Sequence, residues 1–331
     1  MAARFNHIAE AYHRSHNPLM VTQYHLLGEM CGFEEKQRIL DLACGKGEGL
    51  VQWSREFGVV GVGVDTSPDH IAAAQQRAYQ LDVGNTLNFV VGEPADYPEA
   101  HHAFDYVSYM GSTWLGDSLP ERLDKLKAAL KPRHGLLLLG ETYWQQRPTE
   151  AACDALGVPP NAFITLPDLL QVVQQQGYEL IEMLLPDLQQ IDRYEASQWM
   201  AVNQFLRENP DDPEAEDLQR WITANRWTYL SVGRDFLGWG VFVLRPTDVS
   251  AQPMAPTRQH PNQPVAVNID DHMIWVSLAD GRVIGNPVSW YPTLQQADPT
   301  AYEQIELDTS RVHWPALDLT LSVSQMLHGR H

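Results

Sequence analysis

The segment Ile39–Leu50, ILDLACGKGEGL, decides the fold of the amino-terminal part of this chain. Its apolar run ends on Asp41 and passes into a turn with a glycine at every second position from Gly45 to Gly49. A second apolar run, VVGVGV, ends on another acid, Asp65. The spacing predicts a strand, a tight glycine turn, a helix and a parallel strand whose carboxylate lies beside the first turn. Such a unit holds an adenosine-type ligand at the carboxyl edge of a parallel sheet.

Two cofactors compete for a site of this kind, and Asp41 distinguishes between them. A dinucleotide site uses GxGxxG, so that bare backbone and a helix amino end meet an anionic pyrophosphate. Here the run is D-x-x-C-G-x-G-x-G, and the carboxylate of Asp41 would repel a pyrophosphate. The carboxylate suits a ligand with a positive amino group, which S-adenosylmethionine carries and NAD does not. The residues therefore argue against an NAD-linked oxidoreductase.

At these positions the sequence resembles the class I S-adenosylmethionine-dependent methyltransferases. The resemblance reads the family's first motif at Asp41, Gly45 and Gly47, and its ribose-binding acid at Asp65. It implies a doubly wound, Rossmann-like α/β fold with a seven-stranded sheet. It also implies S-adenosyl-L-methionine as cofactor and S-adenosyl-L-homocysteine as product. The chain looks closest to a little-characterised bacterial subgroup, and the match covers residues 38 to 244.

The later strand-like runs continue the resemblance. In TLNFVVGEPADYP, Glu93 stands at the family's adenine-binding position, while the neighbouring Pro94 lacks the backbone donor often used there. The run AFDYVSYM ends before Trp114, where family loops cover the sulfonium, and HGLLLLGETYW follows an LKP-x-x-G turn. The remaining residues predicted to line the cofactor site are Ala43, Thr66 and Met110.

Plainer explanations exist for single residues of this set. Asp65 alone could cap the helix that opens at Pro68. Glu93 alone could be an ordinary exposed loop glutamate. Three acids, each at the end of a successive apolar run and at βαβ spacing, favour the cofactor site.

Two helical segments are predicted to cover the sheet edge. Residues 1–36 form an amino-terminal cap with an amphipathic helical pattern broken at Pro18. Residues 187–230 form a helical insertion that is a substrate cover, a plain packing hairpin or a homodimer contact. A helix opened by Thr165 and Pro167 precedes the last two strands. The cap residues considered for a lid are Tyr12, His13, His16, Tyr24 and His25.

The carboxyl-terminal part is predicted to be a separate small α+β domain. Residues 1–245 form the first domain, residues 246–264 carry five prolines and read as a linker, and residues 265–331 form the second. Alternation on either side of Asp280 and Gly281 predicts a hairpin. The runs ADGR, SWYPTL and VHWPALD resemble a short bacterial domain of unknown function, which implies no activity.

Charge and terminal sequence limit the partners. Forty-two acidic and 23 basic residues give a formal net charge of −19, which repels a polyphosphate backbone and so excludes nucleic acid. A small-molecule acceptor is favoured. No apolar run reaches about 18 residues, so no membrane span is predicted, and the amino terminus lacks a signal core, so we expect a cytoplasmic protein. Cys31, Cys44 and Cys153 lack metal-binding spacing, and no metal site is predicted.

Methyl transfer is an in-line displacement at a sulfonium, in which the enzyme aligns a nucleophile and excludes water. A general base is needed only if the acceptor arrives protonated. The sequence candidates for catalysis are Glu141, His16 and Tyr143, and those for the substrate pocket are Tyr12, Trp114 and Trp199. The alternative is a non-catalytic S-adenosylmethionine-binding regulatory protein with the carboxyl-terminal domain as its partner-binding module.

Overall fold

In the computed structural model the chain forms two compact units, Met1–Pro253 and Met254–His331. The described residues are 2–97, 102–111, 118–132, 134–247, 263–270, 272–279, 282–298, 301, 304–308 and 310–328. Among them, no helix combines the length and the apolarity needed to cross a membrane.

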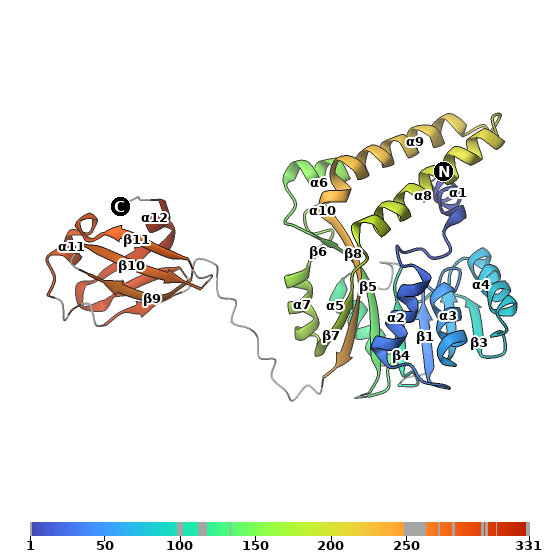
Figure 1. The fold of residues 1–331 in the computed structure, drawn as a ribbon, viewed down its shortest axis with the longest axis horizontal. Helices are drawn as coiled ribbons and strands as arrows, with labels where there is room; N and C mark the ends of the chain where they lie inside the picture. The colour runs from blue at the N-terminus through green and yellow to red at the C-terminus, as the bar shows by residue number, and fades with distance from the viewer. Residues whose placement is uncertain are drawn as a thin grey trace. The chain divides into compact units, whose positions relative to one another are not determined.

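The first unit is built on one mixed sheet with the strand order β3-β2-β1-β4-β5-β8-β7 (Figure 1). The first five strands along the chain are parallel, and β8 is antiparallel to both of its neighbours. A short strand, β6, pairs with the end of β5. The strands are β1 (Arg38–Leu42), β2 (Val60–Asp65), β3 (Leu87–Val91), β4 (Tyr106–Tyr109), β5 (Leu136–Trp144), β6 (Ile164–Thr165), β7 (Tyr178–Leu184) and β8 (Leu237–Pro246). The predicted doubly wound α/β sheet is confirmed.

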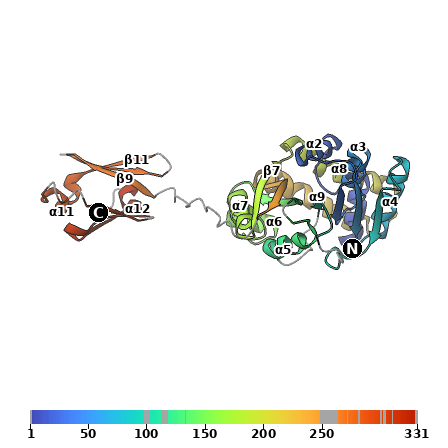
Figure 2. The same cartoon turned by 90° about the horizontal axis from the view of Figure 1, so that it is seen from below.

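Helices cover both faces of this sheet, which explains why its strands are continuous apolar runs. On one face Leu27, Trp53 and Ala74 are fully buried, and on the other Leu123 and Val173 are fully buried. Figure 2 shows the two helical layers on opposite sides of the strands. The helices of the first layer are α2 (Val21–Cys31), α3 (Glu48–Phe57) and α4 (Pro68–Gln80), and those of the second are α5 (Leu119–Ala129) and α7 (Leu166–Gln175).

The helix predicted before the last two strands is α7. Its first turn contains Pro167, and the hydroxyl of Thr165 accepts a hydrogen bond from the backbone N–H of Asp168 at 3.3 Å. The expected capping at this position is confirmed.

A third group of helices lies over the carboxyl edge of the sheet, where the amino-terminal helix meets the insertion (Figure 1). Phe5 and Ala9 of the amino-terminal helix are buried with Val202, Leu218 and Ile222 of the insertion. The cap and the insertion, which the sequence suggested as separate covers, therefore share one core. The elements are α1 (Ala2–Ala9), η1 (Glu10–Tyr12), α6 (Glu150–Leu156), α8 (Leu188–Glu208), α9 (Ala215–Thr228), the π-helix η2 (Tyr229–Gly233) and α10 (Arg234–Phe236).

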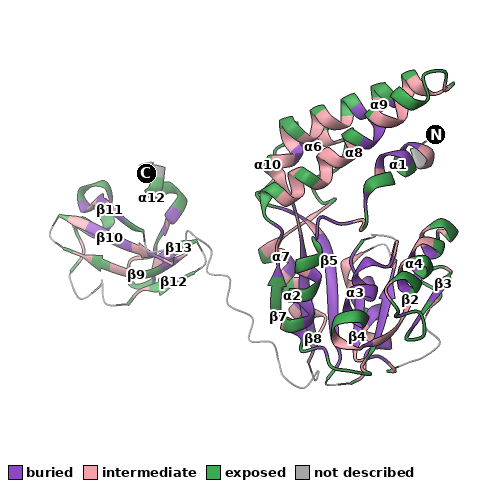
Figure 3. Ribbon diagram, turned by 45° about the vertical axis from the view of Figure 1, so that its right-hand side comes forward, coloured by how far each residue is buried: buried purple, intermediate pink, exposed green. Residues whose placement is uncertain are grey.

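Ion pairs reinforce this joint. The guanidinium of Arg4 contacts the carboxylates of Asp212 at 2.5 Å and Glu214 at 2.6 Å. Figure 3 shows that the outward faces of α8 and α9 are exposed while the sheet beneath is buried. The break in the cap helix is wider than a kink at Pro18, because residues 13–20 are irregular backbone.

The second unit consists of two three-stranded antiparallel sheets around a core that contains Ile274, Leu294 and Trp314. The predicted hairpin is β10 paired with β11; Asp280 and Gly281 at its turn lie outside the described residues. The strands are β9 (Pro264–Ile269), β10 (Met273–Leu278), β11 (Val283–Pro287), β12 (Glu306–Leu307), β13 (Arg311–Trp314) and β14 (Leu319–Ser322). The helices are η3 (Val288–Trp290), α11 (Pro292–Gln295), η5 (Pro315–Leu317) and α12 (Val323–His328).

Candidate functional site

In the turn after β1, three of the five residues 43–47 have a left-handed backbone conformation. Ala43 has φ 54°, Gly45 φ 54° and Gly47 φ 70°. A Cβ on Gly47 would lie 2.8 Å from Cβ of Ala74 and 2.9 Å from the ring of Phe89. Glycine at 47 is therefore required both by the backbone conformation and by the packing of α4 and β3 against the turn.

Gly49 has a different role from the one that its place in the motif suggests. It lies in the first turn of α3, and a Cβ there would approach the ring of Tyr24 to 2.9 Å. The third glycine therefore permits close packing of the cap helix α2 against α3, and it does not belong to the turn itself.

Asp65 stands at the end of β2, where its carboxylate accepts three hydrogen bonds. The donors are the backbone N–H of Gly45 at 2.9 Å, the backbone N–H of Ser67 at 2.9 Å and Nδ1 of His70 at 3.1 Å. Burial raises the pKa of Asp65, but the hydrogen bonds from His70, Ser67 and Gly45 outweigh it and hold the pKa below its ordinary value. The side chain that caps α4 is that of Ser67, not Asp65.

Asp41 is a buried carboxylate with no ion-pair partner among the described residues. Its exposed fraction is 5%. Burial, which penalises the charged form, raises its pKa to about 7. Asp41 lines a small cavity of about 30 Å³ together with Ala43, Gly45, Met110 and His16. A buried carboxylate is costly unless a cation or several donors meet it, so this cavity favours a positively charged group.

The cap closes this small cavity through contacts to the turn. Nζ of Lys46 donates to the carbonyls of Glu10 at 3.0 Å and His13 at 2.8 Å. The guanidinium of Arg14 pairs with the buried carboxylate of Glu48 at 3.1 Å. A cavity of about 30 Å³ is far below the roughly 300 Å³ or more of ligand pockets. The cavity by itself is therefore smaller than a nucleoside-sized ligand.

A second, larger cavity of about 420 Å³ adjoins the first. His16, Asn17 and Gly111 line both cavities, so the two spaces meet at the cap. The other lining residues come from the cap, the carboxyl half of β5, the loop before β6, the insertion, η2 and the start of β8: Pro18, Gly140, Glu141, Thr142, Phe163, Ile191, Tyr194, Glu195, Tyr229, Gly233, Leu237, Gly238 and Trp239.

Two of the three catalytic candidates, Glu141 and His16, line the larger cavity. Glu141 lines the larger cavity, but its carboxylate is ion-paired with Arg122, and both side chains are buried. His16 lies between the two cavities, where burial lowers the pKa of its imidazole to about 3. A general base works best with a pKa near the operating pH, so His16 is poorly suited to take a proton.

Tyr143, which the sequence suggested as a catalytic candidate, is a core residue and does not line the larger cavity. Its side chain is 7% exposed, packs on Phe242 and lies against the backbone of Gly238. Its side chain lies on the face of the sheet that α5 and α7 cover, with Leu137 and Leu139 of the same strand.

Glu195 is the residue that sequence reasoning missed. It lies on α8 and lines the larger cavity with Ile191 and Tyr194, at the i, i+3, i+4 spacing that shares one helix face. Burial raises the pKa of Glu195 to about 7. Nε2 of Gln198 donates to its carboxylate at 3.2 Å. The spacing was readable in the sequence, but a partly apolar helix face normally indicates packing.

Two of the predicted substrate-pocket residues, Tyr12 and Trp199, lie outside the larger cavity. Tyr12 is 45% exposed and bonds to Gln204. The indole N–H of Trp199 donates to Asn225 at 3.1 Å inside the helical hairpin. Neither residue lines the larger cavity, because Tyr12 of η1 contacts α8 and Trp199 of α8 contacts α9. Trp114 lies outside the described residues.

The remaining lid candidates are held by packing and surface contacts. His13 stacks on Tyr194 with ring centroids 4.2 Å apart. Tyr24 is buried, and its carbonyl accepts the indole N–H of Trp53 at 2.7 Å. His25 is exposed between Glu29 and Glu56. Of this set, His16 is the residue that reaches both cavities.

The predicted adenine residues follow β3, next to Asp65. The backbone N–H of Gly92 donates to the carbonyl of Asp65 at 3.0 Å. This hydrogen bond holds the first residue of the loop that carries Glu93 and Pro94 against the end of β2. Glu93 is exposed, as is Thr66 after Asp65. These side chains border the site without being buried in it.

Comparisons with known proteins agree with this geometry. Residues 39–133 match a family model described as a methyltransferase domain, and residues 264–331 match one described as a protein of unknown function, DUF2442. The chain is 37% identical over 239 residues to the uncharacterised protein YjhP of Escherichia coli, covering 72% of this chain and 96% of that protein.

Two further relatives have named activities. A solved S-adenosylmethionine-dependent methyltransferase of Geobacter sulfurreducens, in complex with S-adenosyl-L-homocysteine, is 36% identical with a TM-score of 0.70, covering 73% of this chain and 98% of that chain. The 27-O-demethylrifamycin SV methyltransferase of Amycolatopsis mediterranei is 26% identical over 209 residues, covering 61% of this chain and 64% of that protein.

Proposed function

The chain belongs to the S-adenosylmethionine-dependent methyltransferases, and on this premise we propose that it methylates a small molecule held in the larger cavity. S-adenosylmethionine supplies a methyl group made electrophilic by its sulfonium. The observation that carries the proposal is the junction of the two cavities at His16, Asn17 and Gly111. A ligand at the first turn and an acceptor beside β5 and α8 would meet there.

Three acids are proposed to hold the cofactor. Asp41 would bind the amino group, since it is buried without a cation among the described residues. Asp65 would bind the ribose hydroxyls in addition to the hydrogen bond that it accepts from His70. Glu93 would meet the adenine amino group. The proposed walls are Ala43, Gly45, Gly47, Thr66, Pro94 and Met110.

The larger cavity supports a small, partly apolar acceptor. Its volume of about 420 Å³ lies within the roughly 300–1,000 Å³ of small-molecule sites. Phe163, Tyr194, Tyr229 and Trp239 supply aromatic surface. The formal charge of −19 opposes a nucleic-acid substrate.

Glu195 is proposed as the base that accepts a proton from an acceptor hydroxyl as the oxygen attacks. Its pKa of about 7 leaves a useful fraction of carboxylate at neutral pH while still favouring proton transfer. The Amycolatopsis relative is named for a 27-O position, which supports oxygen as the acceptor atom. The named relatives favour an enzyme over the non-catalytic binding protein.

The experiment uses S-adenosylmethionine with a radiolabelled methyl group and a cell extract separated by size. Transfer of label into the low-mass fraction, matched by S-adenosylhomocysteine formation, is the expected result. Label that appears only in protein or nucleic acid would overturn the small-molecule acceptor. Asp41→Asn serves as the control that abolishes cofactor-dependent transfer.

The role of Glu195 has its own test. With an acceptor identified, Glu195→Gln should lower kcat/KM by about 100-fold or more without changing the affinity for S-adenosylmethionine. Glu208→Gln, an exposed position on the same helix, is the matched control and should keep wild-type rates. Equal rates for both variants would rule out Glu195 as the base.

A further inference from the structure

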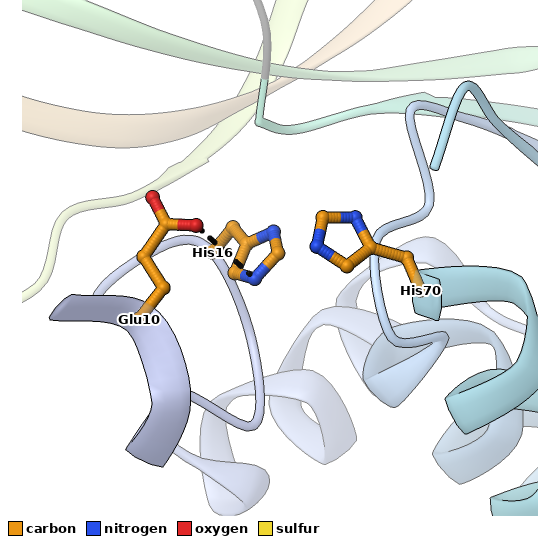
Figure 4. Close-up of side chains that lie close together, drawn as sticks. All are labelled: Glu10, His16 and His70. Carbon is orange, nitrogen blue, oxygen red and sulfur yellow. Dashed lines mark ion pairs between the residues drawn. The ribbon is translucent and has the colours of Figure 1, made fainter. Parts of the chain in front are cut away.

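We propose that Glu10, His16 and His70 form a binding site for a divalent transition-metal ion, for which Zn²⁺ is the best fit. One donor atom from each residue lies within 4.8 Å of the other two. Glu10 belongs to η1, His16 to the irregular segment after it, and His70 to α4. Figure 4 shows the three side chains converging, with His16 between Glu10 and His70. This inference does not depend on the proposed acceptor or base.

His16 offers a donor atom that nothing else in the described structure uses. Its Nε2 is buried and has no hydrogen-bond partner there. The nearest carboxylate oxygen, on Glu10, is 3.8 Å away, which is too long for a hydrogen bond. A buried imidazole nitrogen normally finds a partner, and a metal ion between Nε2 and the carboxylate would supply one.

His70 is oriented as metal-binding histidines usually are. Its Nδ1 bonds to the carboxylate of Asp65 at 3.1 Å, and that carboxylate is itself fixed by two backbone N–H groups. A carboxylate on one ring nitrogen sets the tautomer and leaves the other nitrogen as a ligand. The rings of His16 and His70 lie 4.4 Å apart at 60°, so their edges face a common space.

The geometry needs only a small adjustment. Zinc–nitrogen bonds of about 2.0–2.1 Å place tetrahedral donors about 3.3 Å apart, against the present limit of 4.8 Å. Side-chain rotation covers that difference. Two imidazoles and one carboxylate suit zinc and its neighbours, whereas calcium and magnesium prefer oxygen alone. The side chains of Glu10 and His70 are 34% and 22% exposed, which provides an entry path.

The ion would tie the cap to the core of the first unit. Two ligands come from the cap and one from α4, so coordination would reinforce the contacts of Lys46 to the cap carbonyls. The sequence predicts no metal site, because its three cysteines lack metal-binding spacing. His16 and His70 are far apart in the chain, and only the folding of the cap over the turn brings them together.

The test is titration of the full-length, tag-free and chelator-stripped protein with Co²⁺, followed by visible absorption, and with Zn²⁺, followed by calorimetry. We expect one site per chain and a cobalt spectrum of four-coordinate type. His16→Gln and His70→Gln should each weaken binding at least tenfold. Thermal unfolding without metal checks that the variants fold. Glu10→Gln, at a half-exposed side chain, is the second variant should either histidine variant fail to fold.

His25→Gln is the matched control, because His25 also lies beside two carboxylates, those of Glu29 and Glu56, but forms no group with a second histidine among the described residues. It should bind metal as the wild type does. The proposal is overturned if the wild type takes up no stoichiometric ion, or if the variants at 10, 16 and 70 bind as tightly as His25→Gln.

Discussion

Asp41 shows how one buried side chain can determine ligand choice. It sits at the end of a fully buried strand run, and no described cation meets it. Because its pKa is about 7 in the ligand-free fold and near 3.9 in an unfolded chain, the folded state binds more protons between these values. The contribution of Asp41 to stability is thus present below about pH 4 and is lost as pH rises towards 7.

This linkage predicts the pH dependence of cofactor binding. The ammonium of S-adenosylmethionine requires ionised Asp41, so affinity should rise as pH increases to about 7 and then level off. Calorimetry at pH 6.5 in buffers of different ionisation enthalpy should show proton release on binding, which Asp41→Asn removes. Binding without proton release in the wild type would mean that Asp41 does not meet the amino group.

Gly47 of the first turn and Gly32, which ends α2, allow a matched comparison. Gly47→Ala adds a Cβ at 2.8 Å from Ala74 and at a φ of 70°, whereas Gly32→Ala meets nothing within 4 Å at a φ of 66°. Gly32→Ala should cost about 1–2 kcal/mol of stability from the left-handed backbone, and Gly47→Ala about 1–3 kcal/mol more from overpacking. Urea unfolding of both variants measures the difference; equal losses would show that packing at position 47 is loose.

At the scale of elements, the cap and the insertion depend on each other. Ile222 of α9 is fully buried against α1 and α8. Ile222→Ala should lower stability by about 2–5 kcal/mol and should expose the cap to proteolysis, while Met200→Ala, at a side chain 54% exposed, should do neither. Limited proteolysis with amino-terminal mapping distinguishes the two. Cleavage within residues 10–20 that is unchanged in Ile222→Ala would show that the cap holds without the hairpin.

At the scale of the whole molecule, we propose that residues 1–245 and 265–331 are independent domains. The last strand of the first unit continues to Pro246, which pairs with Tyr178, and the N–H of Thr247 donates to Gly177 at 2.8 Å. A chain ending at Thr247 should therefore keep the wild-type unfolding midpoint and S-adenosylmethionine affinity. If the shortened chain lost either property, the second unit would have to contribute to the stability or the cofactor binding of the first.

Consecutive residues were enough to predict the parallel sheet, the glycine turn and the acids at Asp41 and Asp65. These features depend on short-range periodicity and on the spacing within one βαβ unit, both of which are written in consecutive residues. The helix capped by Thr165 was predictable for the same reason. The resemblance of the motifs to those of the methyltransferases depends on this local pattern.

The contacts of the side chains outside that pattern were not predictable and are seen in the folded chain. Glu141 is paired with Arg122, Tyr143 is in the core, and Gly49 packs a helix; each role is set by a residue far away in the chain. The larger cavity forms because α1 and the insertion fold over the same sheet edge. The same folding places Glu195 at that cavity and brings Glu10, His16 and His70 together. Contacts between distant segments follow from packing of whole helices, for which consecutive residues carry no signal.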